Sequence, residues 1–463
     1  MAAFKLHMFF EGYCKKIKEK LILMDLIITF CLFILFMLGS LALGISMIVP
    51  LLAGMVMFII LGLKRGFGLR NLFILIKDGG LESMVVVRIL LLIGCLTALW
   101  RATGTIAYFV YYGIKTIPPS MFILFAFLLC AIMSYALGTS FGVSGTVGVI
   151  LMTMARAGGV NPVIAAGAML SGVYFGDRGA PASSCASLVA SVTKTNLNKN
   201  VRLMLKSSFF PMIICIIVYG LLSIPNGLNA SDSQVLSLIE QEFLLSPWCV
   251  VPVILLILLV FLGVKIQAVL VIDISLSVVL AVILQGMNVG EVFLQMVKGY
   301  TPKIMALSGI LSGGGVMSLL EVIGILLASC ALAGIFRGTG MLGSIEDKLY
   351  SIGTKAGRFT AMIAASLFTC AVFCNQTIGV IMCRQFIYKS YGDTNEERTE
   401  LMLDLANSVV VIAGLVPWSI ACSVPLAMME ADFRSIPFAV YLYASPICWY
   451  MQKKILNKNK RKA

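Results

Sequence analysis

Long apolar runs separated by short polar stretches make up most of the chain. Each run covers roughly 17–25 residues, which is enough for a helix to cross about 30 Å of hydrocarbon. The apolar residues are continuous and do not alternate, so the pattern favours helices over the strands of a membrane barrel. The predicted spans cover residues 21–39, 41–62, 84–103, 121–138, 140–157, 162–192 with a break, 207–223, 247–263, 267–286, 320–337, 359–373, 374–390, 400–429 with a break, and 436–451.

Composition and charge agree with an all-α polytopic membrane protein of about fourteen helical crossings. The chain is 60% hydrophobic and 12% charged, with a mean hydropathy of +1.01. Its formal net charge of +14 comes from lysines and arginines in short loops and at the two ends. Such residues orient a chain in the lipid bilayer, so they do not indicate a nucleic-acid partner. The basic loop at 64–77 and the basic tail predict a plasma-membrane protein with both termini in the cytoplasm.

Several chemistries lack the residues that they need. His7 is the only histidine, and the thirteen cysteines are scattered through apolar runs without metal-type spacing. The chain contains no Gly-Lys-Ser/Thr phosphate loop, so nothing supports ATP-driven pumping. The sequence therefore predicts neither an enzyme nor a bound cofactor.

An internal repeat turns the string of spans into two related halves. LWRATG at 99–104 and IFRGTG at 335–340 are 236 residues apart, and the same offset relates Pro181 to Pro417. A basic loop precedes the first span of the first half but follows the first span of the second, so the halves are predicted to be inverted. Inverted repeats with interrupted helices are typical of secondary transporters. Chance similarity between apolar sequences is the alternative.

The predicted organisation is 1–83, an N-terminal hairpin and basic loop; 84–223, a first repeat of about five spans; 224–319, an outer loop and linking helices; 320–451, a second repeat of about five spans; and 452–463, a basic tail.

The stretch YFGDRGAPASSCAS at 174–187 interrupts an apolar span with residues that break helices. It carries Asp177, and a carboxylate near the bilayer centre costs about 2.5–3.5 kcal/mol on insertion scales. A cation can replace the proton on such a carboxyl group, which is the simplest chemistry for exchange of Na+ against H+. Ser183 and Ser184 could add oxygen ligands. The alternative is a structural ion pair between Asp177 and Arg178.

Other polar residues interrupt the second half. Asn375 and Gln376 stand between two predicted spans, and Asn407 and Ser408 lead to a break that contains Ser419. Clustered at two breaks, they become candidate cation ligands beside Asp177, although each could also bond only to a neighbouring helix.

These motifs resemble the NhaC-type sodium/proton antiporters of the ion transporter superfamily. The resemblance runs from about residue 90 to 427 and rests on GTSFGVSGTVGVILM, GVYFGDRGAPASS, LAGIFRGTGML, NQTIGVIM and ANSVVVIAGLVPW. The family's Gly-Asp-Lys motif looks like Gly176, Asp177 and Arg178 here. The resemblance implies exchange of Na+ and H+ across the plasma membrane of a bacterium or archaeon, and a homodimer.

Four motifs depart from the family pattern. Ser184 stands where the family has a second aspartate, Asn375 where it has the aspartate of Asp-Gln, Ala406-Asn407 where it has Glu-Asp, and Arg337 where it has a glutamate. The loss of negative charge leaves two hypotheses. One is sodium/proton antiport through Asp177. The other is coupled transport of a small organic acid or amino acid, whose negative group meets helix N-termini or the charge partners Arg178 and Arg337. Arg337 could instead lie at a span end, with its charge at the membrane surface.

Overall fold

The computed structural model describes residues 24–228, 233–341, 351, 353 and 355–460. Within these residues the regular structure is helical, with one isolated backbone bridge between Tyr300 and Gly313. The predicted all-α class is confirmed. Residues 1–23 and 461–463, which belong to the ends predicted to be cytoplasmic, lie outside the described residues.

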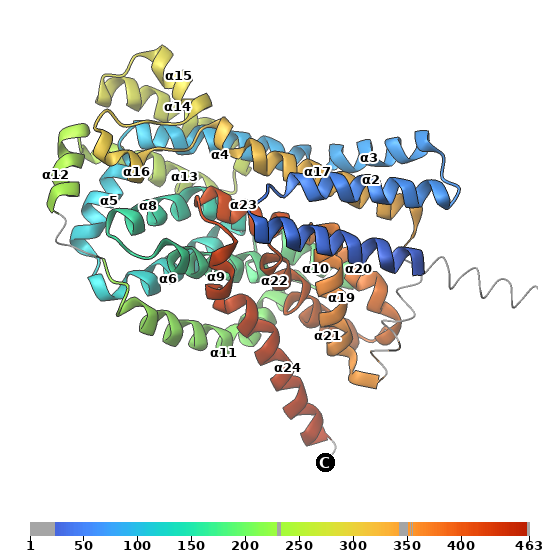
Figure 1. The fold of residues 1–463 in the computed structure, drawn as a ribbon. Coiled ribbons are helices and arrows are strands. Elements are labelled where there is room, and N and C mark those ends of the chain that lie inside the picture. Colours follow the sequence, from blue (N-terminus) through green and yellow to red (C-terminus); the bar gives the residue numbers. More distant parts are fainter. Residues whose placement is uncertain (1–23, 229–232, 342–350, 352, 354, 461–463) are drawn as a thin grey trace, which may run out of the picture.

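The helices follow the predicted runs closely, as Figure 1 shows. The first half contains Met24–Leu43, α2 (Ile48–Lys64), α3 (Leu69–Glu82), α4 (Met84–Ala102), α5 (Thr105–Thr116), α6 (Phe122–Leu137), α7 and α8 within Ser140–Ala157, α9 (Pro162–Gly179), α10 (Ser184–Thr193) and α11 (Leu197–Ser223). The second half contains α12 (Ser233–Glu242), α13 (Val251–Phe261), α14 (Ile266–Gln285), α15 (Val289–Lys298), α16 (Ser308–Leu311), α17 (Leu320–Thr339), α19 (Arg358–Phe373), α20 (Gln376–Ile387), α21 (Asn395–Ala406), α22 (Val409–Ile412), α23 (Ile420–Met428) and α24 (Val440–Lys460).

Among the described residues, seven helices are long and apolar enough to cross a membrane, or nine if each of two bent pairs is one span. Shorter apolar helices accompany them, among them α2, α10 and α19. A polytopic membrane protein is thus supported, while the number of about fourteen crossings stays a prediction. Interrupted helices account for much of the difference, because a half-helix such as α10 is too short to span the bilayer alone.

The basic stretch after Lys64, predicted to be a loop, instead contains the amphipathic helix α3. Leu72 and Gly79 are buried, while Arg70 and Lys77 are exposed. Gly79 lies so close to α17 that an added Cβ would be 2.4 Å from the carbonyl oxygen of Cys330. The charged face concealed this helix in the hydropathy pattern, and packing of its other face stabilises it.

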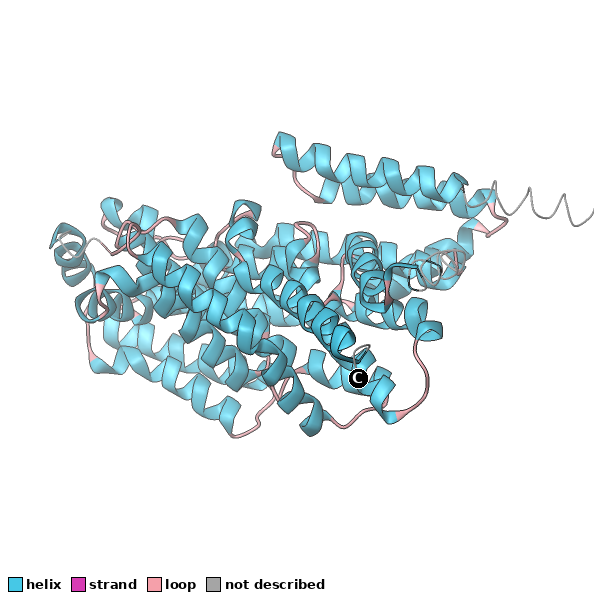
Figure 2. Ribbon diagram, turned by 90° about the horizontal axis from the view of Figure 1, so that it is seen from below, coloured by secondary structure: helices cyan, strands magenta, loops and turns pink. Residues whose placement is uncertain are grey.

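The interrupted helices lie inside the helical body. Of the residues in the segment Ser140–Ala157, 89% are buried, against 28% of the residues in the most apolar part of α14. In Figure 1, α9, α10, α20 and α22 lie centrally, with α14 and α15 at one edge. Figure 2 shows the hairpin of Met24–Leu43 and α2 at another edge. The polar breaks are therefore enclosed by protein.

Backbone geometry repeats at the offset found in the sequence. Left-handed residues occur in three pairs that are each 236 residues apart. The pairs, with their φ angles, are Gly104 (77°) with Gly340 (58°), Gly138 (68°) with Cys374 (54°), and Lys194 (55°) with Glu430 (52°). Because side-chain-bearing residues seldom adopt this conformation, the matches indicate equivalent turns in the two halves.

Candidate functional site

A tight turn joins α6 to the helical segment Ser140–Ala157, and we call residues 138–140 the first tip. Gly138 is left-handed, and an added Cβ would lie 2.4 Å from the carbonyl carbon of Ala182. Both the backbone conformation and the lack of space therefore require glycine here. Thr139 is extended and caps the next helix, since its Oγ1 accepts from the backbone N–H of Gly142 at 3.3 Å.

The second tip, residues 374–376, has the same form between α19 and α20. Cys374 is left-handed, and the Oδ1 atom of Asn375 accepts from the backbone N–H groups of Thr377 and Ile378 at 2.9 and 3.3 Å. The predicted site residue Asn375 is therefore a helix N-cap.

Two chain breaks face these tips. At the first break, residues 180–183, Ala180 is extended and the Ser183 hydroxyl caps α10, accepting from the backbone N–H of Ala186 at 3.1 Å. At the second break, residues 416–419, Ser419 caps α23 in the same way. The carbonyl of Cys374 accepts from the backbone N–H of Ile420 at 2.8 Å, which fixes the second tip against the second break.

A cavity of about 510 Å³ lies where the tips and breaks meet, and we call it the Asp177 cavity. Its lining includes four of the predicted site residues, Asp177, Ser184, Asn375 and Gln376. Thr139, Ser140 and Thr377 also line it, although sequence reasoning missed all three. The offset that relates Pro181 to Pro417 also relates 138–140 to 374–376, and this signal could have found the first tip.

Asp177 is the carboxylate of this cavity and is only 5% exposed. Its Oδ2 atom accepts from Nε2 of Gln376 at 3.2 Å, and the backbone amide of Ser140 also bonds to the carboxylate. Gln376 donates to the carbonyl of Val410 as well, at 2.9 Å, and is thereby held in place. Asp177 thus has neutral donors and forms no ion pair with any described residue.

Arg178 points away into a different set of contacts. Its guanidinium donates to the hydroxyls of Ser207 at 2.6 Å and Tyr441 at 3.0 Å, and to that of Ser208. It also donates to Oδ1 of Asn407 at 2.7 Å and to the carbonyls of Met204 and Ala406 at 3.2 and 3.0 Å. All these acceptors are neutral. The alternative of an Asp177–Arg178 ion pair is therefore not what the structure forms.

The remaining predicted residues lie outside the cavity lining. Asn407 belongs to the Arg178 contacts, and the Ser408 hydroxyl donates to the carbonyl of Asp404 at 2.5 Å. Arg337 forms an ion pair with Glu82 on α3 at 2.5 Å and is 36% exposed.

The chemistry open to the cavity follows from its groups. It offers one carboxylate together with hydroxyl and amide oxygens, which suit a hard monovalent cation or a proton. Helical segments begin at the cavity with Ser140, Ser184, Gln376 and Ile420. Helix N-termini carry partial positive charge, so the same cavity also suits a small anion. The described residues contain no group of three or more His, Cys, Asp or Glu side chains placed to hold a metal ion.

Comparison with known proteins gives one family. The model of the Na+/H+ antiporter family matches residues 16–186 and 172–451. The malate-2H+/Na+-lactate antiporter of Bacillus subtilis (strain 168) is 27% identical over 420 residues, covering 87% of this chain and 90% of the relative. The Na+/H+ antiporter NhaC of Alkalihalophilus pseudofirmus is 24% identical over 405 residues, covering 86% and 88%. The arginine/ornithine antiporter ArcD of Halobacterium salinarum is 25% identical over 395 residues, covering 82% and 81%. The chain therefore belongs to the Na+/H+ antiporter family and is a multi-pass membrane transporter of the NhaC type.

Proposed function

We propose that this chain is a sodium/proton antiporter in which Asp177 binds a cation and a proton in alternation. The observation that carries the proposal is a buried carboxylate that reaches a polar cavity and has neutral hydrogen-bond donors. A carboxylate without a counter-ion in a low-dielectric site is costly, and either Na+ or H+ removes that cost. Since both compete for the same oxygens, release of one accompanies binding of the other.

The surrounding groups are proposed to complete the cation site. The Ser184 hydroxyl and the amide oxygen of Gln376 line the same cavity and offer neutral oxygens. Asn375 also lines it, but its side-chain oxygen caps α20, so it supports the site as a helix cap. Ser183 supports the site indirectly, because its hydroxyl donates to the backbone carbonyl of Asp177. The proposed frame is two inverted repeats of about five spans in the plasma membrane, with both chain termini cytoplasmic. The paired left-handed residues 236 positions apart support the repeat.

Everted vesicles that carry a pH-gradient dye test the function. Added Na+ or Li+ is expected to collapse an established proton gradient in vesicles that contain the protein and to leave control vesicles unchanged. A gradient that persists at every Na+ concentration and pH would refute sodium/proton antiport.

Gln376→Met is expected to raise the Na+ concentration for half-maximal exchange by about tenfold or more, since a hydrogen bond to a charged group contributes about 1.5–3 kcal/mol. Loss of the donor disfavours the ionised carboxyl group, so the proton competes better with Na+. The effect should shrink as the pH rises. Thr377→Val is the matched control, because Thr377 lines the same cavity and valine has its shape. An equal change in both variants would argue against a specific role for Gln376.

A second candidate is the exchange of a small organic acid or amino acid. The start of four helical segments at the Asp177 cavity favours it, as does a volume in the range of small-molecule sites. The names of the malate/lactate and arginine/ornithine relatives point the same way. Counterflow of labelled lactate, malate or arginine, without proton movement driven by Na+, would support this candidate against the first.

A further inference from the structure

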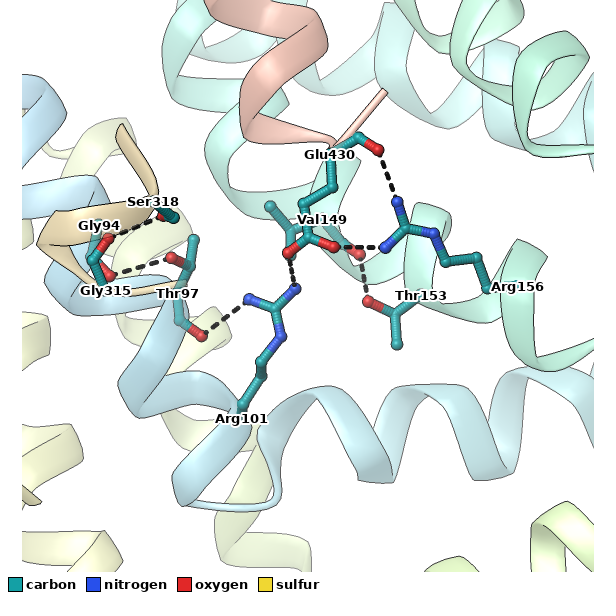
Figure 3. A network of polar contacts seen from close by, with 9 residues as sticks. All are labelled: Gly94, Thr97, Arg101, Val149, Thr153, Arg156, Gly315, Ser318 and Glu430. Atoms are coloured by element: carbon teal, nitrogen blue, oxygen red, sulfur yellow. Dashed lines mark hydrogen bonds and ion pairs between the residues drawn. The ribbon is translucent and has the colours of Figure 1, made fainter. Parts of the chain in front are cut away.

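A cluster of three charged residues, Arg101, Arg156 and Glu430, lies away from the Asp177 cavity, and we call it the Glu430 cluster. Oε1 of Glu430 pairs with Nη2 of Arg101 at 2.6 Å, and Oε2 pairs with Nη1 of Arg156. Nη2 of Arg156 also donates to the backbone carbonyl of Glu430 at 2.6 Å. Figure 3 shows Arg101 reaching Glu430 from below and Arg156 reaching it from the right. Arg101 is 1% exposed and Glu430 is 32% exposed, so the contact is largely shielded from water.

The Glu430 cluster and the Asp177 cavity lie at opposite ends of the same helices. Val86 and Ile89 of α4 line the cavity, and Arg101 follows Ile89 after about 18 Å of helix. Likewise α23 begins at the cavity with Ile420 and ends just before Glu430. The backbone at Gly313 packs directly against the cluster, since a Cβ on this residue would lie 2.4 Å from Oε1 of Glu430.

A second cavity, of about 540 Å³, lies further along α23, and we call it the Glu321 cavity. Val322 and Ile325 of α17 line it, at the 236-residue offset from Val86 and Ile89. Ser423 and Ala427 of α23 also line it, whereas Ile420 and Ala421 line the Asp177 cavity. Ile420, Ser423 and Ala427 follow the spacing of a single helix face. Helix α23 therefore borders both cavities along that face, the Asp177 cavity at its first turn and the Glu321 cavity beyond it.

The internal repeat does not give a second cluster of this kind. The positions that correspond to Arg101 and Glu430 are Arg337 and Lys194, both cationic, so they cannot pair with each other. Arg337 instead pairs with Glu82 on α3. The end of α23 is thus held by two arginines in a way that the end of α10, its counterpart, is not.

We propose that the Glu430 cluster holds α23 in the position that keeps the two cavities apart, and that its ion pairs break when Asp177 becomes accessible from the Glu321 cavity. The proposal rests on the proposed transport function, because a carrier must expose one site to each side in turn. Arg101, Arg156 and Glu430 act as positioning residues and do not bind the transported solute. The loop charges place this cluster toward the outer face of the membrane.

Cys422 provides a natural reporter of α23 movement, since it lies on this helix and is 0% exposed. The measurement is the rate at which N-ethylmaleimide alkylates Cys422 in the purified full-length protein, resolved by peptide mass spectrometry. Glu430→Gln is expected to raise this rate about tenfold or more, because removing one partner leaves two arginines without their shared carboxylate. Buried Cys130 on α6 serves as the internal reference and should keep its rate.

Two further variants make the result specific. The exchanged pair Arg101→Glu with Glu430→Arg keeps one carboxylate and two guanidiniums in the cluster, with an ion pair between positions 101 and 430, and is expected to restore slow alkylation. Glu82→Gln breaks the ion pair between Glu82 and Arg337, which involves no residue of α23, and should leave the alkylation rate of Cys422 unchanged. An unchanged Cys422 rate in Glu430→Gln, or a folded exchanged pair that stays fast, would overturn the proposal. Alkylation needs no ion flux, so this outcome is independent of whether Na+ and H+ prove to be the solutes.

Discussion

Asp177→Asn is expected to reduce sodium-driven proton movement to the level of vesicles without the protein. Asparagine keeps the shape of the side chain and can bond to Gln376, but it neither takes up a proton nor neutralises a cation. The pH-gradient dye in everted vesicles, with equal amounts of each variant in the membrane, measures the loss.

Asp273→Asn is the matched control for this experiment. Asp273 is also a fully buried carboxyl group on an apolar helix, but it lies on α14, away from the Asp177 cavity lining, where Ser277 donates to it at 3.4 Å. Its replacement should leave exchange largely intact. Retained exchange in Asp177→Asn, or equal loss in both variants, would contradict the assignment of Asp177.

Gly176→Ala is expected to destabilise the folded protein by about 3 kcal/mol or more, since inserted atoms in a packed core typically cost 1–3 kcal/mol and here they meet the backbone. A Cβ at Gly176 would lie 2.1 Å from the carbonyl carbon of Ser134 and 2.2 Å from the amide nitrogen of Tyr135. Helices α6 and α9 would have to separate, which would also move Asp177 from the first tip. Thermal unfolding in detergent, followed by size-exclusion chromatography, measures the effect.

Gly179→Ala serves as the comparison on the same helix, one turn further on. An added Cβ there would make an ordinary contact, 3.5 Å from Cβ of Met204. We expect this variant to unfold within a few degrees of the wild-type protein. If the two alanine variants proved equally stable, the close approach of α6 to α9 would be refuted.

The sequence predicted most of the helix positions because apolar runs and helix breakers act locally. The spans 84–103, 140–157 and 320–337 agree with the observed helices within about two residues. A break within 174–187 was also predicted, but it was expected to unwind the chain around Asp177. Helix α9 instead continues through Asp177 and ends at Gly179, before the proline. In contrast, α3 was missed because only one narrow face is apolar and its partner, α17, lies far away in the sequence.

The candidate site was predicted less completely, because it depends on contacts between distant segments. Gln376 and Asp177 are 199 residues apart, and only folding of the second tip against the end of α9 brings them to 3.2 Å. Asn407 carries an amide like that of Gln376, yet it bonds to Arg178. Residue type alone could not distinguish the two amides. The ion pair of Arg101 with Glu430, separated by 329 residues, was hidden for the same reason.

The permanently charged Arg178 beside Asp177 has a consequence for how membrane voltage acts on the proposed cycle. Its six acceptors are all neutral and none belongs to Asp177, so Arg178 keeps its positive charge whether that carboxylate is empty or occupied. Occupancy by either Na+ or H+ then leaves the same single positive charge on this pair. A one-for-one swap would carry no net current, and an electrogenic ratio would require a second titrating group elsewhere in the chain.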